Sequence, residues 1–451
     1  MRDMGQVLLS QLIFAIFFNS ANAFLDPRFP NVVGYLVVRT TVDTSNEMAA
    51  LVKKLNITSS LEDMTSRHVI GKVHFWKTPK KIGRRQGNID ILVSPGEFER
   101  IKKVVEDSGK SLSILHHNAY ELFENSASRQ TRSEAILNMT WTDYHSYNTI
   151  TGFLENIAAK NKFASIHSIG KTFENREMKV LEINTANAQK GFWIDGGIHA
   201  REWISPAVVT FIVNEFVNNY EKHKDVVDAF RWFILPVANP DGYEYSRAED
   251  RLWRKTRSVR PGVNCVGVDP NRNFPYKWME VAGFNDDVCS PIYAGPNSAS
   301  EKCVQNIMSF VMQKLQAESS PSKLVAFYIF HSYSEVWLSP WGWTDELPTS
   351  YSDLMRVAAA GTAAIKEVYG TVFEHGTSAQ ILPPLVSGAG DDWAYGDAKV
   401  PFVYTIELRD KGIHGFLLPP DQIVASGEEM LAGVKASARE ILNILQENRK
   451  P

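Results

Sequence analysis

A histidine and a carboxylate lie three residues apart in the pentapeptide His199-Ala200-Arg201-Glu202-Trp203. This word follows the apolar run FWIDGG at 192–197, which is typical of a buried strand ending in a glycine turn. The segment from Ile204 to Glu221 is predicted to be a helix. Where a strand gives way to a helix, both side chains can turn towards one point as two ligands of a zinc site. A second histidine, as the third ligand, would complete a set that leaves one coordination position open.

The best candidate for the third ligand is His331, which closes the predicted strand 325–330. Functional groups of open α/β sheets gather at the carboxyl ends of strands, and His199 and His331 both occupy that position. Glu407 occupies it too, directly after the predicted strand 402–406. Taken singly, a histidine or glutamate at a strand end is more often a hydrogen-bonded surface residue than a ligand. The coincidence of all of them favours a metal site.

The elements that would position these residues belong to a large α/β pattern that begins at Ser133. Apolar runs predict its strands, as expected for strands covered on both faces, and helix-like segments separate them. The predicted strands are 180–184, 192–195, 232–237, 325–330 and 402–406, and the predicted helices are 208–220, 300–315, 351–369 and 427–445.

Residues 24 to about 120 form a separate pattern in the order strand, helix, strand, strand, helix, strand. The segments are 32–40, 46–55, 69–76, 89–93, 98–105 and 112–115. This order predicts a small ferredoxin-like α+β sandwich. The polar segment 124–133 is predicted to be a linker. Its residues Arg129 and Arg132 are each a cut point for a trypsin-like protease or, alternatively, a solvated arginine in an uncut linker.

Composition gives no indication of nucleic-acid or membrane-surface binding, because the 451 residues carry a net charge of only −3. Residues 7–18 are apolar apart from Ser10 and Gln11 and are followed by an Ala-x-Ala ending at Ala23. This pattern predicts a signal peptide at 1–23, against the alternative of a short buried helix or an anchor. We therefore expect a secreted, extracellular protein, with a digestive lumen as one setting.

The three cysteines agree with secretion. Cys265 and Cys289 bracket a loop-rich segment and are candidates for one disulfide, although spacing alone leaves the pairing open. Cys303 is left over in a helix-like segment, where a buried free thiol is unremarkable. Two sequons, beginning at Asn56 and Asn138, are candidate glycosylation sites.

Further short sequence motifs follow the pentapeptide at 199–203 along the chain. They are NPDGY at 239–243, LWRKTR at 252–257, VDPNRN at 268–273, HSYS at 331–334, ELRD at 407–410 and GFLLP at 415–419. In these motifs the chain resembles a zinc metallocarboxypeptidase of the pancreatic A/B group, in its precursor form. The resemblance implies a catalytic domain at 133–451 with a mixed eight-stranded sheet flanked by helices. It also implies, less specifically, an activation pro-domain and cleavable linker at 24–132.

The resemblance implies a catalytic role for five residues. One zinc ion would be held by His199, Glu202 and His331. Glu407 would be the general base that takes a proton from water and passes it to the leaving amine. Arg254 would polarise the scissile carbonyl and stabilise its oxyanion.

Substrate binding is implied for a second group of residues. Arg272, flanked by Asn271, matches the family's clamp for a free C-terminal carboxylate, and a guanidinium fork suits that bidentate contact. Arg201, Ser332 and Tyr333 match further substrate contacts. Asp269 matches a carboxylate that would accept a hydrogen bond from His199 and fix its ring.

The loop at 381–393 departs from the family pattern. Pro384 stands where the family has a tyrosine that closes over bound substrate, so we expect reduced or altered activity rather than none. Asp391 aligns with the pocket-floor aspartate of B-type enzymes, which predicts a preference for C-terminal lysine or arginine. The alternative is an Asp391 that is solvated or engaged with a neighbour, and an A-type preference for apolar or aromatic residues.

These observations predict a secreted zinc carboxypeptidase made as a zymogen and cut by a trypsin-like protease. It would act as a monomer on peptides and proteins with a free C-terminal carboxylate, with neither nucleic-acid nor membrane partners. A weakly active or non-catalytic peptide-binding homologue is the alternative that Pro384 motivates, and the intact ligands and Glu407 argue against it. A metalloendopeptidase is disfavoured because the chain lacks His-Glu-x-x-His and has a carboxylate clamp.

Overall fold

The computed structural model describes residues 32–57, 73–76, 87–126, 139–281, 286–317, 320 and 323–448. The predicted signal peptide, the two linker arginines and Asn138 lie outside these residues. No helix in the described part of the chain is long and apolar enough to cross a membrane.

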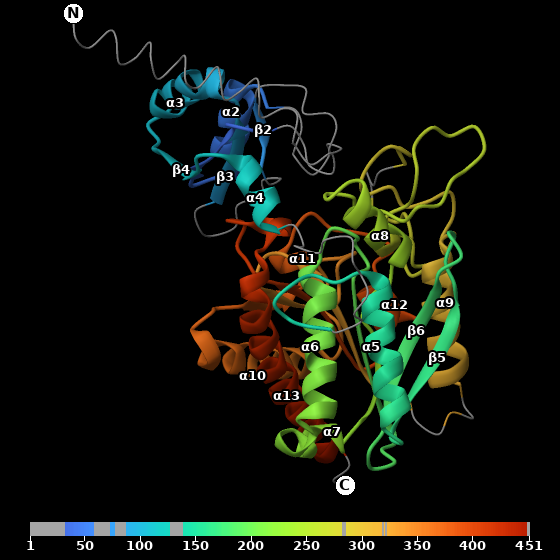
Figure 1. The fold of residues 1–451 in the computed structure, drawn as a ribbon. Coiled ribbons are helices and arrows are strands. Elements are labelled where there is room, and N and C mark those ends of the chain that lie inside the picture. Colours follow the sequence, from blue (N-terminus) through green and yellow to red (C-terminus); the bar gives the residue numbers. More distant parts are fainter. Residues whose placement is uncertain are drawn as a thin grey trace, which may run out of the picture.

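A mixed eight-stranded sheet forms the centre of the large domain, as predicted (Figure 1). Its strand order is β11-β10-β12-β9-β7-β8-β6-β5. The four central strands β12, β9, β7 and β8 run parallel. On one side β10 is antiparallel to β12 and parallel to β11, and on the other side β6 is antiparallel to both β8 and β5. The strands are β5 (Ala164–Lys171), β6 (Glu177–Ile183), β7 (Lys190–Gly196), β8 (Arg231–Leu235), β9 (Lys323–Ser332), β10 (Val336–Ser339), β11 (Glu374–Thr377) and β12 (Phe402–Leu408).

Helices cover both faces of this sheet, and each face has its own apolar core. One face packs against α5 (Tyr147–Lys160), α6 (Ile204–Asn218), α7 (Lys224–Val227), α10 (Tyr351–Tyr369) and α13 (Ile423–Glu447). The other packs against α9 (Lys302–Phe310) and α12 (Gly390–Gly396). Two further helices, α8 (Pro240–Ala248) and α11 (Ser378–Ile381), lie in the connections. The prediction missed β5, β10, β11, the 14-residue helix α5 and the short helices α7, α8, α11 and α12. Segments of four residues, such as β10 and β11, are too short to show a clear period.

The close approach of α6 and α13 depends on a glycine. A Cβ at Gly427 of α13 would lie 2.5 Å from Cγ of Phe211 on α6. Most of the apolar residues of α6 are buried, since the helix lies between the sheet and α13. The N-terminal end of α6 is therefore held firmly, directly after the turn that carries the pentapeptide at 199–203.

The smaller domain has the predicted ferredoxin-like order. Its sheet is arranged β2-β3-β1-β4 and is covered by two helices. The elements are β1 (Leu36–Val42), α2 (Ser45–Leu55), β2 (Val73–Phe75), β3 (Gly87–Val93), α3 (Phe98–Glu106) and β4 (Leu112–His116). The predicted first strand began too early, because a turn occupies residues 33–34.

One part of the linker prediction is wrong. Residues 124–126 belong to a helix, α4 (Ala119–Ser126), which lies between the two domains (Figure 1). Tyr120 and Phe123 on α4 are buried in one cluster with Leu252 and Leu417 of the large domain. The sequence did not predict this helix, because α4 ends in polar residues and its apolar residues are buried only by tertiary contacts.

The cysteine prediction is confirmed, since Cys265 and Cys289 form a disulfide. Cys303 is a buried free thiol on α9. Asn56 is exposed directly after α2.

Candidate metal centre

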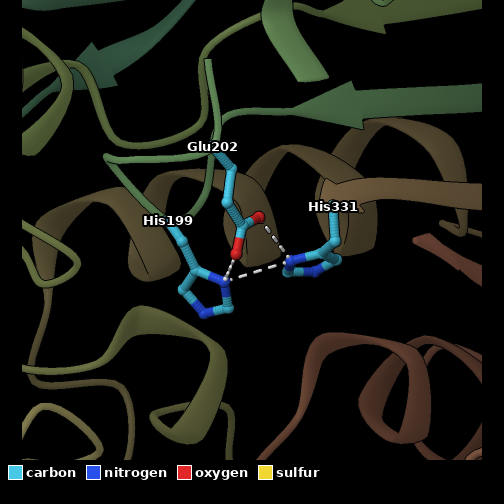
Figure 2. A group of neighbouring side chains, drawn as sticks. All are labelled: His199, Glu202 and His331. Atoms are coloured by element: carbon cyan, nitrogen blue, oxygen red, sulfur yellow. Dashed lines mark hydrogen bonds and ion pairs between the residues drawn. The ribbon is translucent and has the colours of Figure 1, made fainter. Parts of the chain in front are cut away.

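Three side chains converge in the large domain: His199, Glu202 and His331 (Figure 2). One carboxylate oxygen of Glu202 lies 2.7 Å from Nδ1 of His199, and the other lies 3.0 Å from Nδ1 of His331. The two Nδ1 atoms are 3.1 Å apart. All three residues are at most 4% exposed, so water does not screen the group from outside.

The local fold explains how the first two side chains reach one point. Strand β7 ends at Gly196, and Gly197 follows with φ of +63°, a conformation that favours glycine. A Cβ there would also lie 2.9 Å from Cγ of Pro206, at the start of α6. The chain turns within a few residues from β7 into α6, so His199 and Glu202 face the same side.

The pairing of strands in the sheet positions the third side chain, His331. His331 lies on β9, beside β7, and Glu407 stands opposite it in the parallel register of β12 and β9. Both residues lie within their strands rather than just after them, because the β9–β12 pairing continues as far as Ser332 and Leu408. The backbone N–H of Ser332 donates to Glu202 at 3.3 Å. The predicted general base therefore lies on the strand next to a predicted ligand.

The electrostatics of the group suit a cation. Burial alone would raise the pKa of Glu202, but the two imidazoles hold it well below its usual range. Glu202 in turn raises the pKa of His331 against the effect of burial, whereas burial and Arg254 lower the pKa of His199. Two neutral acceptor nitrogens can face each other at 3.1 Å only with a proton or a cation between them. The buried nitrogen and oxygen donors fit a zinc ion.

Asp269 contacts the cluster through Nε2 of His199, the ring nitrogen that faces away from Glu202. It is fully buried and accepts hydrogen bonds from Nε2 of His199 at 3.2 Å and from Arg254 at 2.8 and 3.0 Å. Burial would raise the pKa of Asp269, but Arg254 and His199 hold it well below its usual range. A carboxylate facing Nε2 keeps the proton on that nitrogen and leaves the Nδ1 lone pair directed at the cluster.

The predicted carboxylate clamp lies beside the cluster. Asp269 caps the short 3-10 helix Pro270–Arg272, which carries Asn271 and Arg272. Nδ2 of Asn271 lies 3.4 Å from Nε2 of His331, and its Oδ1 accepts the Gly390 N–H at 2.8 Å. Arg272 donates to the Asn271 carbonyl at 2.7 Å, and burial lowers the pKa of its guanidinium. This helix thus connects the cluster to the first residue of α12.

Asp391 lies at the start of α12 and is only 3% exposed. Its carboxylate accepts the hydroxyl of Ser378 at 3.2 Å and the Asp392 N–H at 2.9 Å. Asp392 accepts the N–H groups of Gly342 and Trp343, each at 3.0 Å. Burial and Asp391 raise the pKa of Asp392 well above its usual range. Asp391 is therefore buried rather than solvated, and it is engaged with a neighbour, Ser378, as in one of the alternatives that the sequence left open.

The loop that departs from the family pattern leads into this region. Pro384 is exposed, and the Val386 N–H donates to the Gly342 carbonyl at 2.9 Å. A Cβ on Gly342 would lie 3.1 Å from a methyl group of Val386. The loop therefore closes against the segment that Asp392 holds, with Pro384 away from it on the surface.

A second group of predicted contacts gathers on the side of the smaller domain. The Arg201 guanidinium lies 4.0 Å above the ring of Phe416, and the rings of Phe416 and Tyr333 meet edge-on at 4.8 Å. Arg251, which the sequence did not single out, is buried and donates hydrogen bonds to the backbone carbonyls of Arg201 and Phe416. Phe416 lies within the GFLLP motif but was given no role of its own, and Arg251 lies just before the LWRKTR motif and belongs to none of the matched motifs.

Comparisons with known proteins agree with this arrangement. A family model described as zinc carboxypeptidase matches residues 150–433. Carboxypeptidase B of Astacus astacus is 43% identical over 303 residues, which are 66% of this chain and 97% of that protein. Zinc carboxypeptidase A 1 of Anopheles gambiae is 36% identical over 361 residues, 79% of this chain and 81% of that protein. The solved structure of thrombin activatable fibrinolysis inhibitor covers 91% of this chain and 99% of its own, with a TM-score of 0.76 at 27% identity.

Proposed function

This chain belongs to the zinc carboxypeptidase family, and from that premise we propose that it is a secreted zymogen whose activated form removes C-terminal lysine or arginine. Residues 1–23 would be its signal peptide, 24–132 its activation segment and 133–451 its catalytic domain. The convergence of His199, Glu202 and His331 carries this proposal. The disulfide between Cys265 and Cys289 supports secretion, since such bonds persist in oxidising compartments.

The chemistry follows from the residues around the cluster. His199, Glu202 and His331 would hold a zinc ion, which when bound would polarise the scissile carbonyl and make water a better nucleophile at neutral pH. Glu407, one strand away from His331, takes the proton of the attacking water and gives it to the leaving amine. Arg254 lies 4.0 Å from Glu202 and donates to the oxyanion that develops on the carbonyl.

Arg272 and Asn271 recognise the free terminal carboxylate. A guanidinium fork binds a carboxylate with two parallel hydrogen bonds, and burial strengthens the contact. Asn271 links this clamp to His331 on one side and to α12 on the other. The terminal peptide bond is therefore placed beside the cluster, which limits cleavage to one residue at a time.

Upstream residues of a bound peptide run along Arg201, Ser332 and Tyr333. We call Arg201, Tyr333 and the adjoining Phe416 the substrate edge. It lies on the side of the smaller domain, because His414, Phe416 and Leu417 share a pocket with Trp76 of that domain. Nε2 of His116 also approaches the Ile413 carbonyl at 3.0 Å. The smaller domain thus lies where a longer substrate would pass, which supports its role in latency.

Asp391 selects the terminal residue. A buried carboxylate next to Arg272 would face the side chain of that residue and attract a cation. We expect Asp391→Asn to lower the kcat/KM ratio of a lysine substrate to its phenylalanine partner by about 30-fold or more, as for one partner of a buried charge pair. The exposed Asp397, also adjoining α12, provides the matched control Asp397→Asn, which should leave the ratio unchanged.

The experiment that tests the proposed function uses the full-length precursor. It is assayed before and after limited trypsin treatment on matched peptides ending in lysine, arginine, phenylalanine or leucine. We expect trypsin to raise the rate and lysine and arginine to be released fastest. Comparable release of phenylalanine and lysine would remove the B-type preference, and peptide binding without turnover would favour the non-catalytic alternative that Pro384 motivates.

A further inference from the structure

We propose that Arg409 and Glu429 are positioning residues that hold the general base Glu407 in place. Arg409 follows Glu407 by two residues, directly after β12, and Glu429 lies on α13. The two side chains form an ion pair for which the proposed reaction has no direct use. The inference rests on the proposed function, because that function makes Glu407 the base.

Arg409 and Glu429 meet in a buried contact with two hydrogen bonds. Nε of Arg409 donates to one carboxylate oxygen of Glu429 at 2.8 Å, and a terminal nitrogen donates to the other oxygen at 2.5 Å. The Glu429 side chain is fully buried, whereas 16% of the Arg409 side chain is exposed. The hydrogen bonds with Glu429 raise the pKa of Arg409 against the effect of burial. A planar guanidinium fork meets a carboxylate in one orientation, so the pair fixes direction as well as distance.

Stability alone does not explain such a pair. Removing two charges from water costs about as much as their attraction returns, so a buried ion pair contributes little net stability. A third segment joins the contact, because the hydroxyl of Thr371, which follows α10, donates to Glu429 at 2.5 Å. The ion pair therefore supplies a fixed geometry between three segments that are distant in the sequence.

The helix side of the contact is rigid. Glu429 lies between Gly427 and Gly433 of α13. A Cβ at Gly433 would lie 3.0 Å from a side-chain carbon of Ile365 on α10 and 3.2 Å from the Trp337 ring on β10. Gly427 allows a similar close approach on the side of α6. Because α13 is packed so closely against α10, β10 and α6, it gives the ion pair a fixed anchor.

The strand side of the contact adjoins the base. Glu407 is paired with β9 on one side and with β10 on the other. The Leu408 carbonyl then accepts the N–H groups of Ser334 and Glu335 at 3.1 and 3.2 Å, and β12 ends there. Arg409 is the next residue, so its side chain fixes the backbone at the point where the sheet no longer does.

The carboxylate of Glu407 lies near the metal centre and the clamp. Burial would lower the pKa of His331, but Glu202 and Glu407 raise it. Burial lowers the pKa of Arg272, and Asp269 and Glu407 oppose this effect. A turn of the backbone directly after Glu407 would move its carboxylate relative to both groups. A displacement of about 1 Å can cost about 10²-fold in rate.

The test uses Glu429→Gln in the full chain after trypsin treatment, on a peptide that ends in the residue that wild type releases best. Glutamine keeps the size of Glu429 but removes the charge that holds Arg409. We expect kcat to fall by about 10- to 100-fold, because the base is displaced. We expect KM to change by less than about twofold and zinc to stay at one ion per chain, because within the described residues the ion pair contacts neither the clamp nor the three converging residues.

A double-mutant cycle distinguishes positioning from support of the fold. Glu429→Gln is measured again in a chain that already carries Glu407→Gln. If the ion pair acts through Glu407, the double variant should have the kcat of Glu407→Gln alone, within about twofold. A pair that only supports the fold would lower kcat by the same factor in both backgrounds, and this result would overturn the inference.

Glu428→Gln is the matched control. Glu428 directly precedes Glu429 on α13, and it accepts the hydroxyl of Tyr369 at the exposed end of α10. This variant removes a charge from the same helix but leaves the contact of Arg409 with Glu429 in place. We expect its kcat to stay near wild type. An equal fall of kcat in Glu428→Gln would contradict a specific role for the ion pair.

Arg409→Lys keeps the positive charge without the fork. We expect its kcat to lie between those of wild type and Glu429→Gln, since an ammonium group can still donate to the carboxylate without fixing its orientation. If Glu429→Gln does not fold, the same cycle is run with Arg409→Lys. Full kcat in Arg409→Lys would mean that the orientation is not needed, which contradicts the inference.

Failure of the proposed function gives a different result. Near wild-type kcat in Glu407→Gln would count against the proposed base and therefore against both proposals. A large loss of kcat in Glu407→Gln, with no loss in Glu429→Gln, would count against the inference alone.

Discussion

Replacing Glu407 with glutamine is expected to lower kcat by about 10²- to 10⁴-fold, the usual range for a general base. Glutamine has nearly the same shape but cannot accept a proton from the attacking water. Its backbone pairing with β9 and β10 does not involve the side chain, so the strand register should be unchanged. Initial rates on a lysine-terminated peptide check the prediction.

The control for this variant is its metal content and its peptide affinity. Glu407 is not among the three residues that converge, so zinc should remain at one ion per chain. KM should change by much less than kcat, because we propose that Arg272 and Asn271, and not Glu407, bind the terminal carboxylate. A Glu407→Gln variant with near wild-type kcat would show that another group moves the proton.

Replacing Arg272 with glutamine should lower kcat/KM for peptides with a free C-terminus by about 10²- to 10³-fold. The expected loss corresponds to a buried bidentate contact between opposite charges, worth about 3–4 kcal/mol. The effect should lie mainly in KM, because the proposed partner of Arg272 is a group of the substrate that does not react. The measurement is a pair of substrates that differ only in a free or an amidated C-terminus.

The amidated substrate distinguishes the clamp from general damage. Wild type should process it poorly, since it lacks the charge that Arg272 is proposed to recognise. Arg272→Gln should remove most of the difference between the two substrates. If the variant keeps the full preference for the free carboxylate, another cation, for example Arg201 or Arg254, must be the clamp.

The sequence predicted the central part of the site well for a physical reason. The three converging residues and the proposed base Glu407 fall at or just after the ends of apolar strands, and parallel strands with short register offsets bring such ends together at one edge. His331 and Glu407 stand opposite each other in adjacent strands. The spacing of His199 and Glu202 around a glycine turn also follows from local sequence. These features depend on few contacts between segments that are distant in the sequence.

Features that depend on packing between distant segments were not predictable. Helix α4 is buried by contacts with Leu252 and Leu417, and its own letters are partly polar. The contact of Asp391 with Ser378 depends on how α11 and α12 meet. Arg251 joins backbones at 201 and 416, which no local pattern brings together. Such contacts become visible only once the register and the layers are known.

The most direct test of the central claim is a titration of activity with zinc. The trypsin-treated chain is stripped of metal with a chelator and receives zinc stepwise, while bound metal and released amino acid are measured together. We expect activity to rise linearly to one zinc per chain and to release single residues from a free C-terminus. Release that survives complete removal of the metal, or cleavage inside a C-terminally amidated peptide, would contradict a zinc exopeptidase built on His199, Glu202 and His331.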